Sequence, residues 1–170
     1  MSLRIACSES LQKKLSHPVH PAENHATPLL DVWHATTFTA HNTEILLFTN
    51  QVAAFSLLVP AKKNMSFEEL EATFKHALLE QVGEHKSLHD YQHFFEKKLK
   101  HGMTFTRDQE STLHWLVEGI QNLFTQDPEH TKDLAKACHR INNSEFPELD
   151  FKSPAHTLMF TLASMPHDDA

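Results

Sequence analysis

The segment of residues 33–60, WHATTFTAHNTEILLFTNQVAAFSLLVP, constrains the fold most, because it holds three strand-like runs joined by short turns. Its Trp, Thr, Phe, Ile, Leu and Val residues suit the pleated, half-buried surface of a sheet. His41 and Asn42 predict a hairpin turn, since Asn tolerates the left-handed conformation that tight turns need. A second turn is expected at residues 50–51, and Pro60 ends the sheet because it cannot donate to a ladder. The segment therefore predicts an antiparallel β-meander.

A short apolar run and a long loop precede the meander. Residues 3–6 are predicted to form a further strand, at the edge or in the centre of the sheet. Ser8 or Ser10 can then cap a brief turn of helix. Residues 16–27 are expected to form a loop, because their prolines lack backbone donors and favour extended neighbours.

The chain becomes helical after the meander. Ser66 and Glu69 form a capping box, in which each side chain accepts the amide of the other residue, so a helix is expected to begin there. Its apolar residues recur at helical spacing, and Gly83 stands where a C-terminal cap is common. A second helix is expected over roughly residues 87–99.

Two further helices and a closing segment follow. A capping-box pattern at residues 106–109 predicts the start of the third helix. Asp127 as N-cap, with Pro128 at the first helical position, predicts the start of the fourth. Residues 158–162 fit either a last strand or a short closing helix, because five apolar residues show no decisive period.

The composition indicates one ordered domain. With 40% hydrophobic and 22% charged residues, a chain of 170 residues is long enough to bury a core. We expect an α+β fold in which an N-terminal antiparallel β-meander packs against about four C-terminal helices. The single domain divides into a strand-rich part (1–60), a helical part (65–145) and a short closing segment (150–165).

Compartment can also be predicted from the sequence. The apolar runs are too short to span a membrane, and the first ten residues lack the apolar core of a signal peptide. Two cysteines, Cys7 and Cys138, do not make a disulfide framework, so both are expected to be reduced. These features predict a cytoplasmic protein.

The formal charge of −7 lies beyond the strand-rich part, since residues 1–64 hold five Lys and Arg against four Asp and Glu, which gives +1 and leaves −8 for residues 65–170. An acidic helical half repels a phosphate backbone, which disfavours sequence-independent nucleic-acid binding. The three glycines cannot build a phosphate-cradling loop, so no nucleotide cofactor is expected.

Histidine is in clear excess, with 15 among 170 residues. His85, His89 and His93 stand at i, i+4 and i+8, which would place them in one row on a single helix. Neighbours four apart lie about 6 Å from each other on one side of a helix, so an adjacent pair can share a metal ion. Glu96 continues the row, and His89, His93 and Glu96 make a conceivable zinc site with water as the fourth ligand.

The alternative for this row is a set of solvated side chains. The row lies at the flank of the predicted apolar stripe and runs towards solvent, and no HExxH pattern is present. We therefore expect no cofactor, with zinc as the alternative. His17, His20 and His25 decorate the long loop, where solvated side chains are the more common state.

His34, beside Trp33 in the first strand of the meander, is the remaining candidate. A strand histidine is most often a hydrogen-bonded residue of the sheet face, so a structural role and a ligand-binding role both stay open. Cys138 is expected to be a small buried hydrophobe rather than a nucleophile.

The meander also resembles a known family. Its W-H-A…F…LLFTN…FSLLVP series is similar to the N-terminal part of a bacterial, cytosolic family of unknown function, some members of which are described only as plasmid-related. The matching positions are Trp33, His34, Ala35, Phe38, Leu47, Phe48, Thr49, Asn50, Phe55 and Ser56. The resemblance covers roughly residues 1–80 and continues more weakly at residues 141–143, 147, 149 and 151–154. It implies an architecture and no reaction, and it leaves His34 as the matched polar residue that no turn explains.

Two kinds of function fit these observations. No nucleophile, base and orienting group stand in a recognised pattern, which favours a non-catalytic module that binds a protein or small-molecule partner. The alternative is a metal-binding protein or metal-dependent hydrolase that uses His85, His89, His93 and Glu96. Nucleic acid and membranes are disfavoured as partners, and the sequence does not indicate an oligomeric state.

Overall fold

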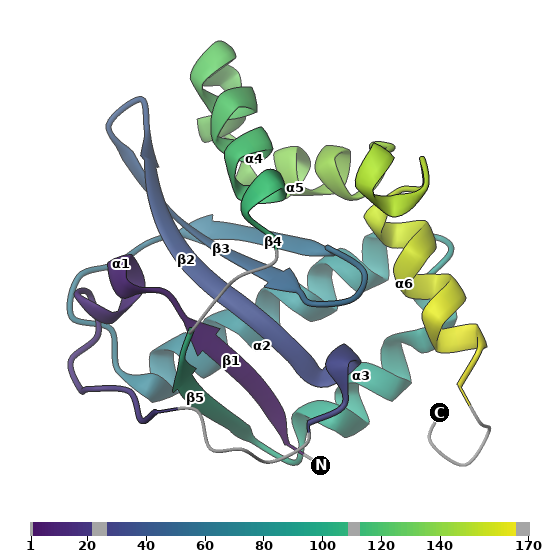
Figure 1. Cartoon of the computed structure of the whole chain (residues 1–170), viewed down its shortest axis with the longest axis horizontal. Coiled ribbons are helices and arrows are strands. Elements are labelled where there is room, and N and C mark those ends of the chain that lie inside the picture. Colours follow the sequence, from purple (N-terminus) through teal and green to yellow (C-terminus); the bar gives the residue numbers. More distant parts are fainter. Residues whose placement is uncertain (1, 22–26, 109–112, 166–170) are drawn as a thin grey trace.

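Five strands form one sheet in the computed structural model, which describes residues 2–21, 27–108 and 113–165 (Figure 1). In chain order they are β1 (Leu3–Cys7), β2 (Val32–Ala40), β3 (Thr43–Asn50), β4 (Ser56–Pro60) and β5 (Met103–Arg107). Their order across the sheet is β4-β3-β2-β1-β5. The predicted α+β class is confirmed, and four of these strands precede the main helices.

The α-helices in the described ranges are α1 (Glu9–Gln12), α2 (Phe67–Glu84), α3 (Gln92–Leu99), α4 (His114–Gln126), α5 (Leu134–Asn142) and α6 (Pro154–Ala163). Short 3-10 turns are η1 (Leu29–Asp31), η2 (His89–Tyr91), η3 (Pro128–Thr131) and η4 (Pro147–Leu149). The closing segment is thus a helix, begun by Ser153, whose hydroxyl accepts the His156 amide at 3.2 Å. Within the described residues, no helix combines the length and apolarity needed to cross a membrane.

The predicted meander is present in β2, β3 and β4, which pair antiparallel. His41 and Asn42 turn the first hairpin with φ angles of 46° and 63°, as a two-residue hairpin turn requires. The middle strand β3 is buried on both faces from residue 45 to residue 50. Pro60 is the last residue of β4 and pairs with Ile45, so the sheet ends where proline predicts.

The sheet is nevertheless mixed, and the prediction of a purely antiparallel meander is wrong in this respect. β1 lies between β2 and β5 and runs parallel to both. The capping-box pattern predicted at residues 106–109 is also wrong, because Thr106 belongs to β5 and α4 begins only at His114; residue 109 lies outside the described residues. Thr104 and Thr106 alternate with Phe105, and this period of two suits a strand that pairs with β1 along its whole length.

Helix α2 begins as its capping box predicts. The Ser66 hydroxyl accepts the Glu69 amide at 3.1 Å, and the Glu69 carboxylate accepts the Ser66 amide at 2.9 Å. The predicted stop at Gly83 is wrong, since α2 continues to Glu84 and His85 is its C-cap. Val82 and His85 are buried, and their packing keeps the last turn helical through the glycine.

Replacing Ser66 by alanine is expected to lower the free energy of unfolding by about 1 kcal/mol, because the Glu69 amide loses its partner at the exposed end of the helix. Urea unfolding measures this change, with the exposed Ser87, which begins no helix, replaced by alanine as the control. Equal losses in the two variants would contradict a capping role for Ser66.

Two predicted helices begin later than expected. Residues 87–99 do not form one helix: the chain turns after His85, forms η2 and then begins α3 at Gln92. Leu88 is fully buried, so the chain turns inward at that point instead of running on. Asp127 with Pro128 begins only η3, and the helix proper starts after Asp133, whose carboxylate accepts the Lys136 amide at 3.0 Å.

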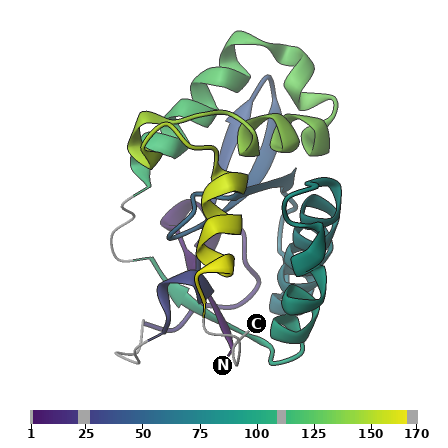
Figure 2. The same ribbon diagram turned by 90° about the vertical axis from the view of Figure 1, so that its right-hand side faces the viewer.

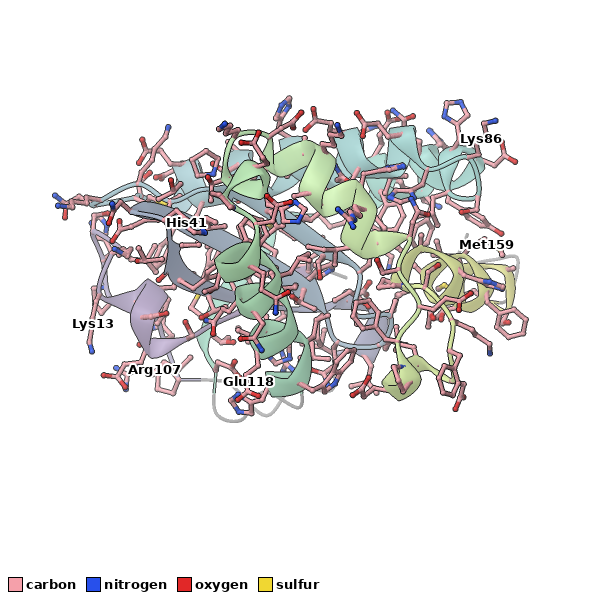
Figure 3. All side chains as sticks on the ribbon, turned by 90° about the horizontal axis from the view of Figure 1, so that it is seen from above. Lys13, His41, Lys86, Arg107, Glu118 and Met159 are labelled. Atoms are coloured by element: carbon pink, nitrogen blue, oxygen red, sulfur yellow. The ribbon has the colours of Figure 1, made fainter. Side chains whose placement is uncertain are left out.

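The two faces of the sheet pack against different helices, as the edge-on view in Figure 2 shows. α2, α3 and α6 contribute to the core on one face, where the Phe74 ring lies edge-on to Trp33 and Phe48, with centroids 5.0 and 5.1 Å away. α4 and α5, seen from above in Figure 3, pack around Phe38 and Phe124 on the other face. The chain therefore has two cores separated by the sheet.

Candidate functional site

The sheet face that meets α4 and α5 is apolar over only part of its extent. Paired residues on neighbouring strands point to the same side, so the register places Arg4 with Thr104, and His34 and Thr106 on either side of Ala6. The part of the face away from α4 and α5 carries polar side chains, and we call it the polar face: Arg4, His34, Thr49, Gln51, Thr104, Thr106 and Asp108.

Figure 1 views the sheet from the polar face. α2 and α3 lie behind the strands, and α4 and α5 lie over the upper part of the sheet. Within the described part of the chain, no helix crosses the front of β1 and β5. The described part of the chain thus places no helix over the polar residues of β1 and β5.

His34 is held from both sides. Its Nδ1 lies 3.1 Å from Oδ2 of Asp108, and its Nε2 contacts the side-chain oxygen of Gln51. The His34 and Asp108 side chains are 12% and 14% exposed, so the pair is largely shielded from water. Asp108 follows β5, and its amide donates to the carbonyl of Cys7 at 2.9 Å, which fixes the carboxylate beside the ring.

These partners decide the protonation of His34. Burial by itself lowers the pKa of the ring, and the nearby charge of Arg4 acts in the same direction. The hydrogen bonds to Asp108 and Gln51, together with the charge of Asp108, outweigh both and raise the pKa above 6.5. An imidazolium donates from both nitrogens, which matches an acceptor on each side of the ring.

Three polar atoms of the polar face are buried with no hydrogen-bond partner among the described residues: Nε of Arg4 and the hydroxyls of Thr49 and Thr106. A buried polar group left without a partner costs about 1–3 kcal/mol, and a charged one costs more. Native proteins keep few such groups, and each marks a place where something outside the chain can pair with it. The remaining three in the described ranges lie on α2 and α5 and their ends, at Gln81, His85 and His139.

A cavity of about 430 Å³ opens along the edge of β5. Arg4, Thr104 and Thr106 line it from the polar face, so two of the unpartnered atoms belong to residues of its wall. Phe67 and Phe105 line it as well, with their rings stacked at 4.9 Å between centroids and 4° between planes. The volume lies within the range of about 300–1,000 Å³ that is usual for small-molecule sites.

Neither thiol is activated as a nucleophile. Cys7 and Cys138 are free and buried, one in each core. Burial raises the pKa of Cys7 to about 12, with a further contribution from the charge of Asp108, and burial also raises that of Cys138 to about 12. Because the thiolate is the nucleophile, neither side chain is activated, and Cys138 is the buried hydrophobe that the sequence predicts.

The four residues of the predicted metal site do not come together as one set of ligands. His85 is the buried C-cap of α2 and stacks on His139, whereas His89 lies in η2 and His93 lies exposed on α3, 3.6 Å from Glu96. The predicted single helical row is therefore wrong, because the chain turns after His85. Burial, and then the charge of His139, lowers the pKa of His85 to about 4. No group of three or more His, Cys, Asp or Glu side chains in residues 2–21, 27–108 and 113–165 is placed to hold a metal ion.

The histidines of the long loop also take different positions. His20 pairs with Thr106 in an isolated bridge and lines the cavity, and the His17 ring lies 6.3 Å from that of Phe67. His25 lies outside the described residues. His20, which the sequence analysis expected to be solvated, thus lines the cavity, and the predicted candidate His34 lies on the adjoining polar face.

A comparison with protein families matches residues 4–157 to a domain of unknown function, DUF6933. The chain belongs to this family. No curated protein and no solved structure matches the chain. The predicted resemblance to a family of unknown function is confirmed, and membership transfers no reaction or ligand to this DUF6933 domain.

The sequence did not point to four residues of the DUF6933 site: Arg4, Gln51, Thr106 and Asp108. One signal was present for Arg4, since an arginine inside the apolar run LRIAC must be placed on a face of a central strand. A second was the alternation in MTFTR, which puts two threonines on one face. Gln51 and Asp108 follow strands, and only the assembled sheet shows that both reach His34.

Proposed function

We propose that this DUF6933 domain is a non-catalytic module that binds a small ligand at the polar face and its cavity. The observation that carries the proposal is that Arg4 and Thr106, which each hold a buried polar atom without a partner among the described residues, both line one cavity. A ligand that brings polar groups to these two residues would offset the cost of burying them.

Two observations favour binding over catalysis. Both thiols have a pKa raised to about 12, so neither supplies a nucleophile near neutral pH. His34 has one ring nitrogen beside Asp108 and the other beside Gln51, so neither nitrogen is left to take a proton from a substrate. The free cysteines also fit a reducing compartment, and we place the protein in the cytoplasm on that ground.

A screen of small molecules by amide NMR tests the proposal. Bound compounds are expected to shift the amide signals of β5 and of Arg4, and a Thr104→Phe variant, which fills the cavity from an exposed strand position, is expected to abolish these shifts. Thr39→Phe is the matched control, because Thr39 is an exposed strand threonine away from the cavity. Binding that persists in Thr104→Phe, or a screen in which no compound perturbs β5, would refute the proposal and leave water as the partner of these atoms.

A further inference from the structure

The Arg4 guanidinium forms no ion pair with any residue that the structure describes. No hydrogen bond or ion pair joins its side chain to any residue that the structure describes, and its Nε is buried. Two well-shielded carboxylates of the chain are already engaged, Asp108 by His34 at 3.1 Å and Asp31 by Lys98 at 2.9 Å. The chain has a formal charge of −7, yet this arginine of an inner strand has no carboxylate partner among the described residues. Its guanidinium can therefore bind an anion.

The donors around Arg4 suit an oxyanion. A guanidinium presents its N–H groups as a planar fork, which fits the two oxygens of a carboxylate or a phosphate. Arg4 pairs in register with Thr104, and Thr106 lies two residues further along the same face, with its hydroxyl buried and without a partner. Thr106 is only 9% exposed, so its side chain is held in place where the residue lines the cavity.

The same cavity has an apolar wall. The stacked rings of Phe67 and Phe105 line it beside Pro21, at the edge of β5. A volume of about 430 Å³ exceeds what a bare inorganic ion needs, since a water molecule takes about 30 Å³ in the liquid. Because Phe105 points to the opposite side of β5 from Thr104 and Thr106, the cavity reaches around the edge of the sheet, with its polar-face end open to an oxyanion and its other end open to an apolar body.

We propose that the ligand is an organic anion, a carboxylate or phosphate monoester whose charged group binds Arg4 and Thr106 and whose apolar body packs on Phe67 and Phe105. This inference rests on the proposed function, because it names the class of ligand for the same cavity. A carboxylate and a phosphate monoester can both present two oxygens to the fork, and they differ in charge and in the third terminal oxygen of the phosphate.

The experiment titrates the full chain with benzoate, phenyl phosphate and the neutral benzamide, followed by amide NMR. Benzoate or phenyl phosphate is expected to shift the signals of Arg4 and β5, and benzamide to bind about tenfold or more weakly, because it lacks the charge. Tighter binding of benzoate assigns a carboxylate, and tighter binding of phenyl phosphate assigns a phosphate monoester.

Variants separate Arg4 from general charge effects. Arg4→Gln is expected to weaken binding of the anions about tenfold or more, while Arg4→Lys keeps the charge and loses only the fork. Arg107→Gln is the matched control, since Arg107 is an exposed arginine at the end of the edge strand β5. Its side chain projects outward (Figure 3). Thr106→Val is expected to weaken binding several-fold, with Thr49→Val as the control for a buried hydroxyl outside the cavity.

The outcomes distinguish this inference from the proposed function. Equal binding of benzoate and benzamide, or anion binding unchanged in both Arg4→Gln and Arg4→Lys, would overturn the anion inference and leave a small-ligand site standing. If no probe, charged or neutral, shifts the signals of Arg4 and β5, both proposals fail. The amide spectrum of each variant without ligand shows directly whether the fold is retained.

Discussion

Replacing Asp108 by asparagine is expected to lower the free energy of unfolding by about 2–3 kcal/mol at pH 6, and by much less at pH 9. Asp108 is shielded and faces Nδ1 of His34 at 3.1 Å, so the substitution leaves a buried imidazolium without its counter-charge. The folded protein raises the pKa of His34 above 6.5. The pair therefore contributes its full stability below the unfolded pKa and loses it as pH rises through the folded pKa.

Urea unfolding of the wild type and the variant at pH 6, 7.5 and 9 measures this dependence. Asp127→Asn is the matched control, because Asp127 also faces a histidine, His130, but at 3.7 Å and with 47% of its side chain exposed. Its cost is expected to stay below about 1 kcal/mol. A cost for Asp108→Asn that is the same at pH 6 and pH 9 would contradict the charged state of His34.

A double-mutant cycle with His34→Gln assigns the effect to the pair. The coupling free energy between positions 34 and 108 is expected to be largest at pH 6 and to shrink at pH 9, since the carboxylate stabilises the imidazolium more than the neutral ring. Gln51 contacts the other ring nitrogen, so Gln51→Leu is expected to reduce the same pH dependence by removing one acceptor.

Features set by neighbouring residues could be predicted from the sequence. The first hairpin follows from His41 and Asn42, which adopt the left-handed angles that the turn requires. The start of α2 follows from Ser66 and Glu69, three residues apart. In each case the residues that determine the structure lie within one turn of each other, so a short stretch of sequence contains the whole cause.

The mixed sheet could not be predicted in this way. β5 pairs with β1 although about 100 residues separate them, as in the contact between Thr104 and Leu3. A five-residue strand with one buried face gives a weak pattern, and the apparent capping box that includes Thr106 gave a competing one. The pairing with β1 decides between the two patterns, because it fills the backbone hydrogen bonds of the whole strand.

The site shows the same division. His34 could be singled out from its strand, but Gln51 and Asp108, which hold it, lie 17 and 74 residues away. The abundance of histidine pointed instead to His89 and His93, which the structure leaves exposed. Counting a residue type does not reveal burial, and burial is what makes Arg4 and Thr106 costly without a partner.

Replacing Asn142 by alanine is expected to lower the free energy of unfolding by about 2–4 kcal/mol. Asn142 ends α5 and is fully buried, and its side chain bonds both backbone groups of Ser56 at the start of the edge strand β4. Its Oδ1 accepts the Ser56 amide at 2.8 Å, and its Nδ2 donates to the Ser56 carbonyl at 2.7 Å. Alanine leaves a buried amide unpaired, while the carbonyl keeps the thiol of Cys138 at 2.9 Å.

Asn143→Ala is the matched control, because Asn143 is the next residue, is exposed, and bonds to His139 of its own helix rather than to β4. Its cost is expected to stay within about 0.5 kcal/mol, as for most surface substitutions. Hydrogen exchange of the Ser56 amide gives a second measurement, since protection at this edge position comes from the Asn142 side chain. Unchanged protection in Asn142→Ala would show that β4 holds its edge without α5. Faster exchange at Ser56 together with the larger loss of stability would show that the Asn142 side chain attaches α5 to the sheet. This attachment would then hold α4 and α5 on the part of the sheet face next to Arg4 and His34.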